Sequence, residues 1–381
     1  MRDEMMQTMT IGSKRIGPGQ PVFVIAEAGC NHECSLQTAK RMVREAAKAG
    51  ADAIKFQTYK AETLATRSAP KYWSHVPGAP RTQFEFFKQL DHFDRREFTA
   101  LAEECRRAKI LFLSTPWDLR SADLLERLGM PAFKIGSADL TYLPLIRHCA
   151  LKGKPMILST GAARFEEIEA AVQTVLACGN RQIVLLHCVL SYPTPPTSVN
   201  LAMIEELQRR FPDFPVGFSD HTIADEHLTI QIAAAAVGAR VIEKHYTLNK
   251  RAAGNDHWHS LEPADFKQMI TSLRLVDAAM GRAGTRVPLP CELPARRLAR
   301  RSVVANQDIP RGALITEAWL TCKRPGTGIS PAEIPQLKGA QARRAIPEDT
   351  TITWSMVEPR RKRKTRHHRV TGEQPKPVGA G

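Results

Sequence analysis

Short apolar runs alternate with longer stretches of helical periodicity along about the first 280 residues of the chain. The runs are partly β-branched and apolar on both faces, which is typical of parallel strands buried on both sides. They predict eight strands, at 21–27, 51–57, 110–115, 132–135, 155–159, 183–188, 216–219 and 240–245. Between them, apolar residues recur at intervals of three and four positions, which predicts helices that include 35–48, 95–109, 164–178, 201–211 and 225–237.

This alternation predicts a (β/α)8 barrel, because eight strand–helix units over this length match that architecture in size and number. A doubly wound sheet is the alternative, but such a sheet usually carries a glycine-rich phosphate loop after its first strand. The corresponding segment here, EAGCNH at 27–32, is not such a loop. The long segment 58–94, between the second and third strands, is expected to form an excursion over the barrel mouth.

The remainder of the chain predicts a second, smaller domain. A proline-rich stretch at 287–294 interrupts the alternation, so we expect a barrel domain over 1–286 and a linker over 287–299. Residues 300–358 combine short β-like segments with Pro and Gly turns, which predicts a small β-rich domain. The final segment, 359–381, is basic and then rich in Gly and Pro, which is typical of a disordered tail.

Charge and cysteine content narrow the class of protein. The formal net charge is +15, and the tail contributes eight Lys or Arg residues against one Glu. The remaining surplus suits an anionic substrate. The tail has no aromatic residue on which a base could stack, so no nucleic-acid partner is expected. Eight cysteines without a C-x-x-C pair, no signal peptide and no membrane-length apolar run predict a soluble, cytoplasmic protein with reduced thiols.

Polar residues collect at the ends of the predicted strands. Since the carboxyl ends of all barrel strands converge on one mouth, we expect an active site there. Lys55 and Gln57 are two positions apart and therefore point to the same side, as do Glu243 and His245. The other strand-end candidates are Glu27, Thr115, Lys134, Ser137, Ser159, Ser219 and His221.

These residue types indicate two kinds of binding. Two buried lysines with Ser137, Ser159 and Ser219 make a plausible cradle for a phosphate or carboxylate. His221 and His245, on adjacent strands, are candidates to hold a divalent ion as a Lewis acid, and no third protein ligand is evident. The alternative for each histidine is a structural, hydrogen-bonded role. A shell of histidine and water favours manganese or magnesium over structural zinc.

Carboxylates at the mouth complete the candidate chemistry. Glu27 and Glu243 are candidates for acid–base groups or charge stabilisers. Asp256, in the loop after the eighth strand, is placed to bond sugar hydroxyls. Its alternative role is that of a turn-forming residue.

Several strings resemble the N-acetylneuraminate (sialic acid) synthase family. In chain order they are IAEAGCNHECSL (25–36), KFQTYKAE (55–62), FKIGSADL (133–140), ILSTGAA (157–163), LHCVLSYPTPP (186–196), GFSDHT (217–222) and VIEKHYTL (241–248). The segments RRSVVANQDIPRGALIT (300–316) and KRPGTGISP (323–331) are similar to the C-terminal antifreeze-like, or SAF, domain of that family. The resemblance covers about residues 15 to 358.

The resemblance implies a metal-dependent transferase that condenses phosphoenolpyruvate (PEP) with N-acetylmannosamine or a related N-acetylated hexose. Water is consumed, and the products are a nonulosonic acid such as N-acetylneuraminate and inorganic phosphate. Glu27, Lys55 and Glu243 would be catalytic, and His221 and His245 would hold Mn²⁺, with Mg²⁺ or Co²⁺ as alternatives. The implied substrate-binding residues are Gln57, Thr115, Lys134, Ser137, Asp139, Ser159, Tyr192, Ser219, Asp256 and Arg324.

The resemblance also implies a domain-swapped homodimer, in which Arg324 of one SAF domain contacts the sugar in the partner's barrel. Two residues depart from the family pattern. Leu190 stands where Asn or Ser usually helps to hold the PEP phosphate, and Asp139 stands where Glu is usual. The open alternatives are a legionaminate, pseudaminate or sialic acid 9-phosphate synthase, another PEP-condensing sugar-acid synthase, and a non-catalytic sugar-binding homologue.

Overall fold

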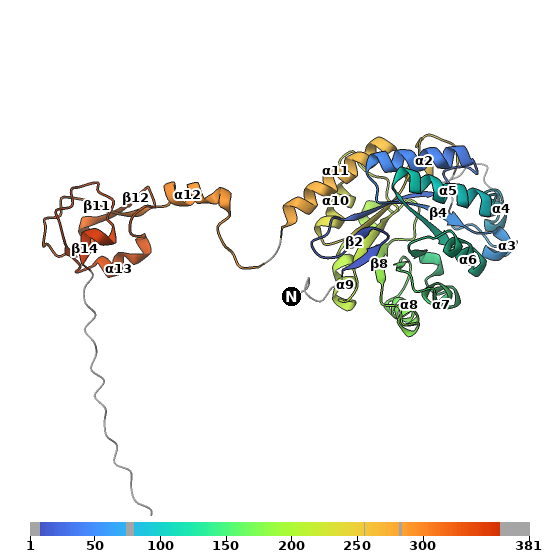
Figure 1. Cartoon of the computed structure of the whole chain (residues 1–381), viewed down its shortest axis with the longest axis horizontal. Helices are drawn as coiled ribbons and strands as arrows, with labels where there is room; N and C mark the ends of the chain where they lie inside the picture. Colours follow the sequence, from blue (N-terminus) through green and yellow to red (C-terminus); the bar gives the residue numbers. More distant parts are fainter. Residues whose placement is uncertain (1–7, 74–79, 255, 282–283, 359–381) are drawn as a thin grey trace, which may run out of the picture. The chain divides into compact units, whose positions relative to one another are not determined.

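Eight parallel strands form a closed barrel in the first part of the chain, in the order β5-β4-β3-β10-β9-β8-β7-β6 (Figure 1). β5 and β6, at the two ends of this order, lie side by side and close the circle. The strands are β3 (Phe23–Gly29), β4 (Ala53–Thr58), β5 (Leu111–Pro116), β6 (Phe133–Ile135), β7 (Met156–Ser159), β8 (Ile183–Cys188), β9 (Val216–Asp220) and β10 (Val241–His245). The predicted barrel is therefore confirmed.

The computed structural model describes residues 8–73, 80–254, 256–281 and 284–358. It divides into two compact units, 1–282 and 283–381, and each is described by itself. The predicted tail, 359–381, lies outside the described residues. Among the helices of the described residues, none has both the length and the apolar character needed to span a bilayer.

A helix follows each barrel strand before the next strand begins. These helices are α2 (Leu36–Ala49), α5 (Arg95–Ala108), α6 (Leu119–Arg127), α7 (Leu143–Ala150), α8 (Phe165–Ala177), α9 (Ala202–Arg210), α10 (Thr229–Ala236) and α11 (Pro263–Met280). In α2, the Ser35 side chain accepts from the Thr38 N–H at the start, and Gly50 ends the helix at φ 93°. The helix therefore begins and ends where its capping residues predict.

One predicted helix, 225–237, begins later than expected. The Asp225 carboxylate accepts hydrogen bonds from the backbone N–H groups of His227 and Thr229, at 2.9 and 3.0 Å. An aspartate side chain that accepts hydrogen bonds from backbone N–H groups two and four residues ahead stabilises a non-helical turn, which replaces the first turn of the predicted helix. Leu228 has a left-handed φ of 57°, and α10 begins at Thr229.

A hairpin of β1 (Met9–Ile11) and β2 (Lys14–Ile16) covers the end of the barrel where the strands begin. Ile11 and Ile16 are fully buried. Lys14 Nζ lies 2.8 Å from Asp52 Oδ1, just before β4. Because the hairpin fills this end, the opposite end, where the strands finish, is the accessible mouth.

The long segment after β4 forms the expected excursion at the mouth. It contains α3 (Ala61–Leu64) and α4 (Gln83–Lys88). Lys60 Nζ donates to the Asp91 carbonyl at 2.6 Å, and Ala61 N–H donates to Asp91 Oδ2 at 2.9 Å. These bonds fasten the two ends of the excursion to each other, so its aromatic side chains are held beside the mouth.

The second unit is small and strand-rich, as predicted. β11 (Ser302–Ala305) pairs antiparallel with β12 (Leu320–Lys323), and β13 (Gln341–Ala342) with β14 (Val357–Glu358). Its separate core is apolar and includes Val303, Ile309, Ile315, Leu337, Ile352 and Val357. The short helices η4 (Pro290–Glu292), α12 (Leu293–Leu298) and α13 (Ile334–Leu337) also belong to it, and the first two lie in the segment predicted as a linker.

Candidate active site

Strand register places the candidate residues on one face of the strands, at two neighbouring levels of the barrel. Glu27 on β3 is level with Lys55 on β4 and with His245 on β10. Glu243 is level with Ser219 on β9. Because register partners in a sheet point to the same face, these side chains all point into the barrel.

The intervening residues of β9 and β10 point outward, toward the helices. Lys244 Nζ lies 2.9 Å from Asp220 Oδ2, and both side chains are fully buried. Gln231 on α10 also donates to the Asp220 carboxylate. Lys244 and Asp220 therefore join the barrel to its helical layer and take no part in the mouth.

A cavity of about 220 Å³ occupies the mouth. Every candidate site residue of the barrel lines it: Glu27, Lys55, Gln57, Thr115, Lys134, Ser137, Asp139, Ser159, Tyr192, Ser219, His221, Glu243, His245 and Asp256. Arg324 follows β12 in the second unit, so it does not belong to this cavity within the barrel unit.

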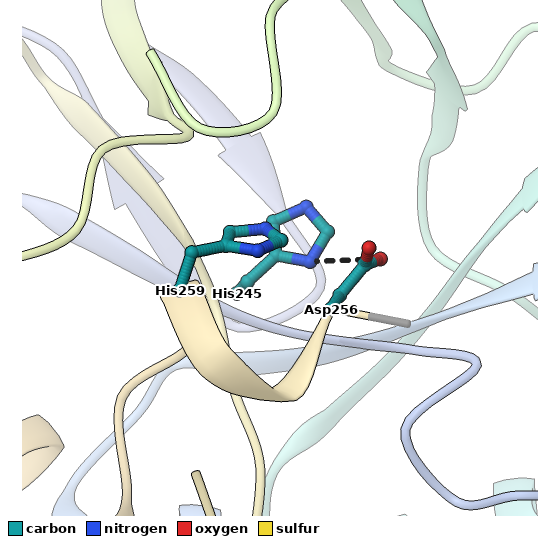
Figure 2. Close-up of side chains that lie close together, drawn as sticks. All are labelled: His245, Asp256 and His259. Atoms are coloured by element: carbon teal, nitrogen blue, oxygen red, sulfur yellow. Dashed lines mark ion pairs between the residues drawn. The ribbon is translucent and has the colours of Figure 1, made fainter. Parts of the chain in front are cut away.

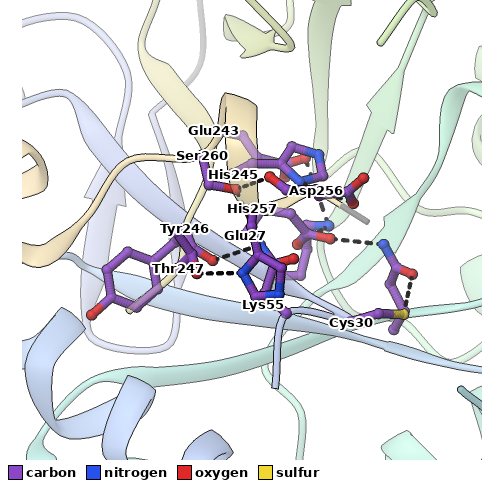
Figure 3. A network of polar contacts seen from close by, with 12 residues as sticks. Glu27, Cys30, Lys55, Glu243, His245, Tyr246, Thr247, Asp256, His257 and Ser260 are labelled. Carbon is purple, nitrogen blue, oxygen red and sulfur yellow. Dashed lines mark hydrogen bonds and ion pairs between the residues drawn. The ribbon is translucent and has the colours of Figure 1, made fainter. Parts of the chain in front are cut away.

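Two carboxylates and two lysines form the charged floor of the cavity, defined as Glu27, Lys55, Lys134 and Glu243. Figure 3 shows three of them, Glu27, Lys55 and Glu243. Lys55 Nζ lies 2.5 Å from Glu27 Oε2 and 3.6 Å from Glu243 Oε1. Lys134 Nζ lies 3.4 Å from the same Glu243 oxygen. Each of these four charged side chains is at most 5% exposed, so their charges must be balanced within the protein. The balance comes from two positive lysines that lie beside two negative carboxylates.

The charged floor sets the protonation of its members. Burial alone would raise the pKa of Glu243, but Lys134 and Lys55 outweigh burial and lower that pKa to about 2. Burial likewise opposes the charge on Lys55, but Glu243 and Glu27 together raise the Lys55 pKa. Among the described residues, Lys134 has one carboxylate within 4 Å, that of Glu243, and burial lowers the Lys134 pKa. Glu243 is therefore an ionised carboxylate at neutral pH, and Lys134 holds its proton less tightly than Lys55.

Amide and hydroxyl groups surround the charged floor. Gln57 Nε2 donates to Glu27 Oε1 at 3.1 Å, and Cys30 Sγ donates to Gln57 Oε1 at 3.3 Å, which fixes the orientation of the Gln57 amide. Ser219 Oγ donates to Glu243 Oε1 at 3.1 Å. The buried Ser159 hydroxyl has no hydrogen-bond partner within the described part of the chain, so it is available to a ligand.

The environment of Leu190 bears on its departure from the family pattern. Leu190 lines the cavity, where its side chain has no hydrogen-bonding group. The neighbouring Ser191 hydroxyl donates to the Pro193 carbonyl at 3.1 Å and does not line the cavity. Ser137 Oγ accepts from the Gly161 N–H at 3.0 Å and keeps its own proton to donate. Ser137 is thus better placed than Ser191 to contact an anion.

The histidines at the mouth offer ring nitrogens suited to a metal ion. His221 Nδ1 lies 2.8 Å from the Val189 carbonyl, so Nδ1 donates and Nε2 keeps a lone pair. The His221 and His245 ring centroids are 5.4 Å apart. His245 Nδ1 lies 3.3 Å from Asp256 Oδ2, and His245 lowers the pKa of Asp256 despite the opposing effect of burial. This donor set fits a divalent cation.

A third histidine, His259, was not predicted. One ligand atom each from His245, Asp256 and His259 lies within 4.8 Å of the other two (Figure 2). Asp256 is the N-cap of the 3-10 helix η3 (His257–His259), and His259 is the last residue of that helix. Residues three apart eclipse in such a helix, so the spacing D-x-x-H was the available signal. Burial lowers the pKa of His259 to about 2, so its imidazole is neutral.

An aromatic wall, which the sequence did not predict residue by residue, surrounds the outer part of the cavity. It consists of Tyr72, Trp73, Phe86, Phe87, Trp117 and Trp258. Phe87 on α4 packs edge-on against Trp117 at 5.3 Å between centroids, and Trp73 packs against both Phe86 and Phe87. The mouth therefore combines a charged floor with an apolar rim.

Comparisons with known proteins agree with this arrangement. The NeuB family model matches residues 42–285, and the SAF domain model matches residues 300–358. The chain is 38% identical over 353 residues to the N,N'-diacetyllegionaminic acid synthase of Legionella pneumophila, which covers 91% of this chain and 98% of that protein. It is 36% identical over 347 residues to the human N-acetylneuraminate-9-phosphate synthase, which covers 90% of this chain and 94% of that protein.

A solved structure supports the same assignment. The sialic acid synthetase of Leptospira borgpetersenii, crystallised with citrate, matches with a TM-score of 0.67 and 35% identity. The match covers 76% of this chain and 95% of that one. With a family model across most of its barrel and relatives that match along nearly their whole length, this chain belongs to the NeuB family and carries a C-terminal SAF domain.

Proposed function

We propose that this protein is a synthase that condenses PEP with N-acetylmannosamine, or a related N-acetylated hexose, to give a nonulosonic acid such as N-acetylneuraminate and inorganic phosphate. Two of its relatives are named as an N,N'-diacetyllegionaminic acid synthase and an N-acetylneuraminate-9-phosphate synthase. The observation that carries the proposal is the charged floor beside His221 and His245 within one cavity. An anionic enol substrate needs the positive charge of the lysines, and a carbonyl substrate needs a metal ion held by the histidines. The reaction between them requires these groups side by side.

PEP would lie on the charged floor. Lys55 and Lys134 supply positive charge, and Ser137, Ser159 and Ser219 supply hydroxyl donors around them. The unpartnered Ser159 hydroxyl supports this placement, because a buried hydroxyl without a partner costs about 1–3 kcal/mol until a ligand accepts from it.

His221 and His245 would hold a divalent cation, with Mn²⁺ the first choice and Mg²⁺ or Co²⁺ as alternatives. When bound, such an ion polarises the aldehyde of the open-chain sugar. The protein positions the PEP methylene carbon against that aldehyde carbon and excludes bulk water from the pair. The enol π electrons form the new carbon–carbon bond, and the aldehyde oxygen takes up a proton to become a hydroxyl.

Glu243 would stabilise the positive charge that develops on the former enol carbon. Its ionised carboxylate is held by Lys55, Lys134 and Ser219, so it costs no reorganisation when that charge appears. Water adds to this carbon and loses a proton. The tetrahedral product then expels inorganic phosphate by cleavage of the bond between carbon and the ester oxygen, which leaves a ketone. Glu27 and Lys55, paired at 2.5 Å in the cavity floor, would exchange these protons.

The aromatic wall favours an uncharged acceptor sugar. The lysines among the described lining residues, Lys55 and Lys134, both belong to the charged floor, whereas the outer part carries Trp73, Phe86 and Phe87. Aromatic faces pack well against the methyl of an acetamido group and poorly against a phosphate. This weighs against a sugar phosphate as the acceptor, and leaves Gln57, Tyr192 and Asp256 to bond its hydroxyls.

We also propose a homodimer in which Arg324 reaches the sugar bound in the partner's barrel. Co-expression of Arg324→Ala with Glu243→Gln tests this, because a mixed dimer would combine an intact barrel with an intact Arg324 at one of its two sites. Random pairing should restore about a quarter of the wild-type activity. Activity no higher than the mean of the two single variants would contradict the exchange.

The deciding experiment measures phosphate release from PEP by the purified protein with Mn²⁺. The acceptor panel is N-acetylmannosamine, its 6-phosphate and diacetylated hexoses. Release that requires one uncharged sugar, and that stops when a chelator removes the metal, is the expected result. A folded, metal-loaded protein that releases no phosphate with any of these sugars would refute the proposed activity.

A further inference from the structure

His259 is buried with no protein partner for its ring nitrogens within the described residues. Its side chain is 1% exposed, and neither Nδ1 nor Nε2 has a hydrogen bond there. By comparison, both ring nitrogens of His257, in the same turn, have protein partners. His257 Nδ1 lies 2.7 Å from Thr247 Oγ1, and its Nε2 lies 3.2 Å from Glu33 Oε1. A buried imidazole without partners costs about 1–3 kcal/mol, so His257 has a structural role and His259 requires a ligand to explain it.

The His259 ring faces two groups that are themselves suited to a metal. Its centroid lies 4.7 Å from that of His245 (Figure 2). His245 Nδ1 and Asp256 Oδ2 are 3.3 Å apart, and His245 Nδ1 makes no hydrogen bond in the described part of the chain. This ion pair sets a ring nitrogen and a carboxylate oxygen at a separation that neighbouring ligands of one metal ion would have.

The spacing of this cluster suits a first-row divalent ion. Ligand atoms of His245, Asp256 and His259 all lie within 4.8 Å of one another. An ion with bonds of about 2.1 Å separates its donors by roughly 3.0 to 4.2 Å. The 3.3 Å pair already satisfies this range, and the His259 donor lies within 4.8 Å of both.

We propose that His259 is a ligand of the divalent cation in this site, together with His245 and Asp256. This inference rests on the proposed metal-dependent function and adds a donor beyond the His221 and His245 pair. Nitrogen-rich sites favour later first-row ions, whereas Mg²⁺ prefers oxygen ligands. His259 therefore makes the site prefer Co²⁺ or Mn²⁺ over Mg²⁺. Asp256 retains its second carboxylate oxygen for a sugar hydroxyl.

The test measures metal binding to the full-length, metal-stripped protein in the absence of PEP and sugar. Mn²⁺ and Co²⁺ dissociation constants come from competition with a chelating dye, and pulsed EPR on bound Mn²⁺ reports the directly bound nitrogens. His259→Ala and His259→Phe should each weaken both constants at least tenfold and remove one nitrogen from the EPR signal. His259→Phe preserves an aromatic ring of similar shape, so it tests the nitrogen donors even if the alanine variant folds poorly.

The matched control is His227→Ala, because the His227 side chain is 79% exposed. Its constants should equal those of the wild type. Unchanged constants and nitrogen signal in His259→Phe, alongside lost binding in His245→Ala, would overturn the inference. If the wild type binds metal with the predicted His259 dependence but releases no phosphate with any sugar, the ligand assignment stands and the proposed activity fails.

Discussion

Replacement of Glu243 by glutamine tests the proposed electrostatic role most directly. Glutamine has nearly the same shape and can still accept from Ser219, but it removes the only charge that Lys134 contacts within 4 Å in the described residues. The substitution therefore changes the charge of the floor without opening a cavity.

The expected magnitude follows from the electrostatics of the floor. Lowering the Glu243 pKa from 4.5 to about 2 corresponds to about 3 kcal/mol of net stabilisation of the ionised carboxylate. Glu243→Gln should lose folding stability of that order at neutral pH. If the same charge stabilises the transition state, turnover should fall by about 10²- to 10³-fold.

The pH dependence has a defined sign. A carboxyl group whose folded pKa is lowered contributes its stability above its unfolded pKa, and this contribution disappears as the pH falls through the folded pKa. The stability difference between wild type and Glu243→Gln should therefore be constant above about pH 5 and shrink between about pH 4.5 and pH 2. The activity ratio should stay constant from pH 6 to pH 8.

Urea unfolding followed by tryptophan fluorescence measures the stability, and phosphate release measures the turnover. Glu205→Gln, at an exposed position on α9, is the matched control and should behave as the wild type. A folded Glu243→Gln protein that keeps more than a tenth of the wild-type turnover would refute the proposed role.

Three further predictions address other parts of the chain. Burial raises the pKa of Asp139 from 3.8 to about 6, so the folded protein loses stability as the pH rises through that range. Above pH 6, the free energy of unfolding of Asp139→Asn should exceed that of the wild type by up to about 3 kcal/mol, and below about pH 4 the two should be equal. Urea unfolding at the two pH values measures this difference. Lys244→Met leaves the buried Asp220 carboxylate without its lysine and should cost about 3–5 kcal/mol, whereas Asp220→Asn in the same chain should recover part of this loss in urea unfolding. Deletion of 359–381 should leave phosphate release unchanged, and a fall of severalfold would give the tail a role in catalysis.

The sequence was sufficient to place the barrel strands and most of the candidate site. Apolar runs set the strand positions to within about two residues, and 183–188 coincides with β8. Lys55, Glu243 and the other strand-end residues could be assigned to one mouth because a parallel barrel brings all its carboxyl ends together. Local periodicity therefore located side chains that are far apart along the chain.

Tertiary structure alone decided which polar residues work together. Glu243 and Lys244 are adjacent charged residues that the sequence does not distinguish. In the structure Lys244 points toward the helices and pairs with Asp220, whereas Glu243 points into the barrel and belongs to the charged floor. His259 and His257 lie in one turn, yet only His257 finds protein partners among the described residues. The aromatic wall needed the excursion to fold over the mouth. Sequence patterns report the periodicity of one element, whereas hydrogen bonds, ion pairs and metal ligands depend on distances of a few ångströms between different elements, which only the packed structure sets.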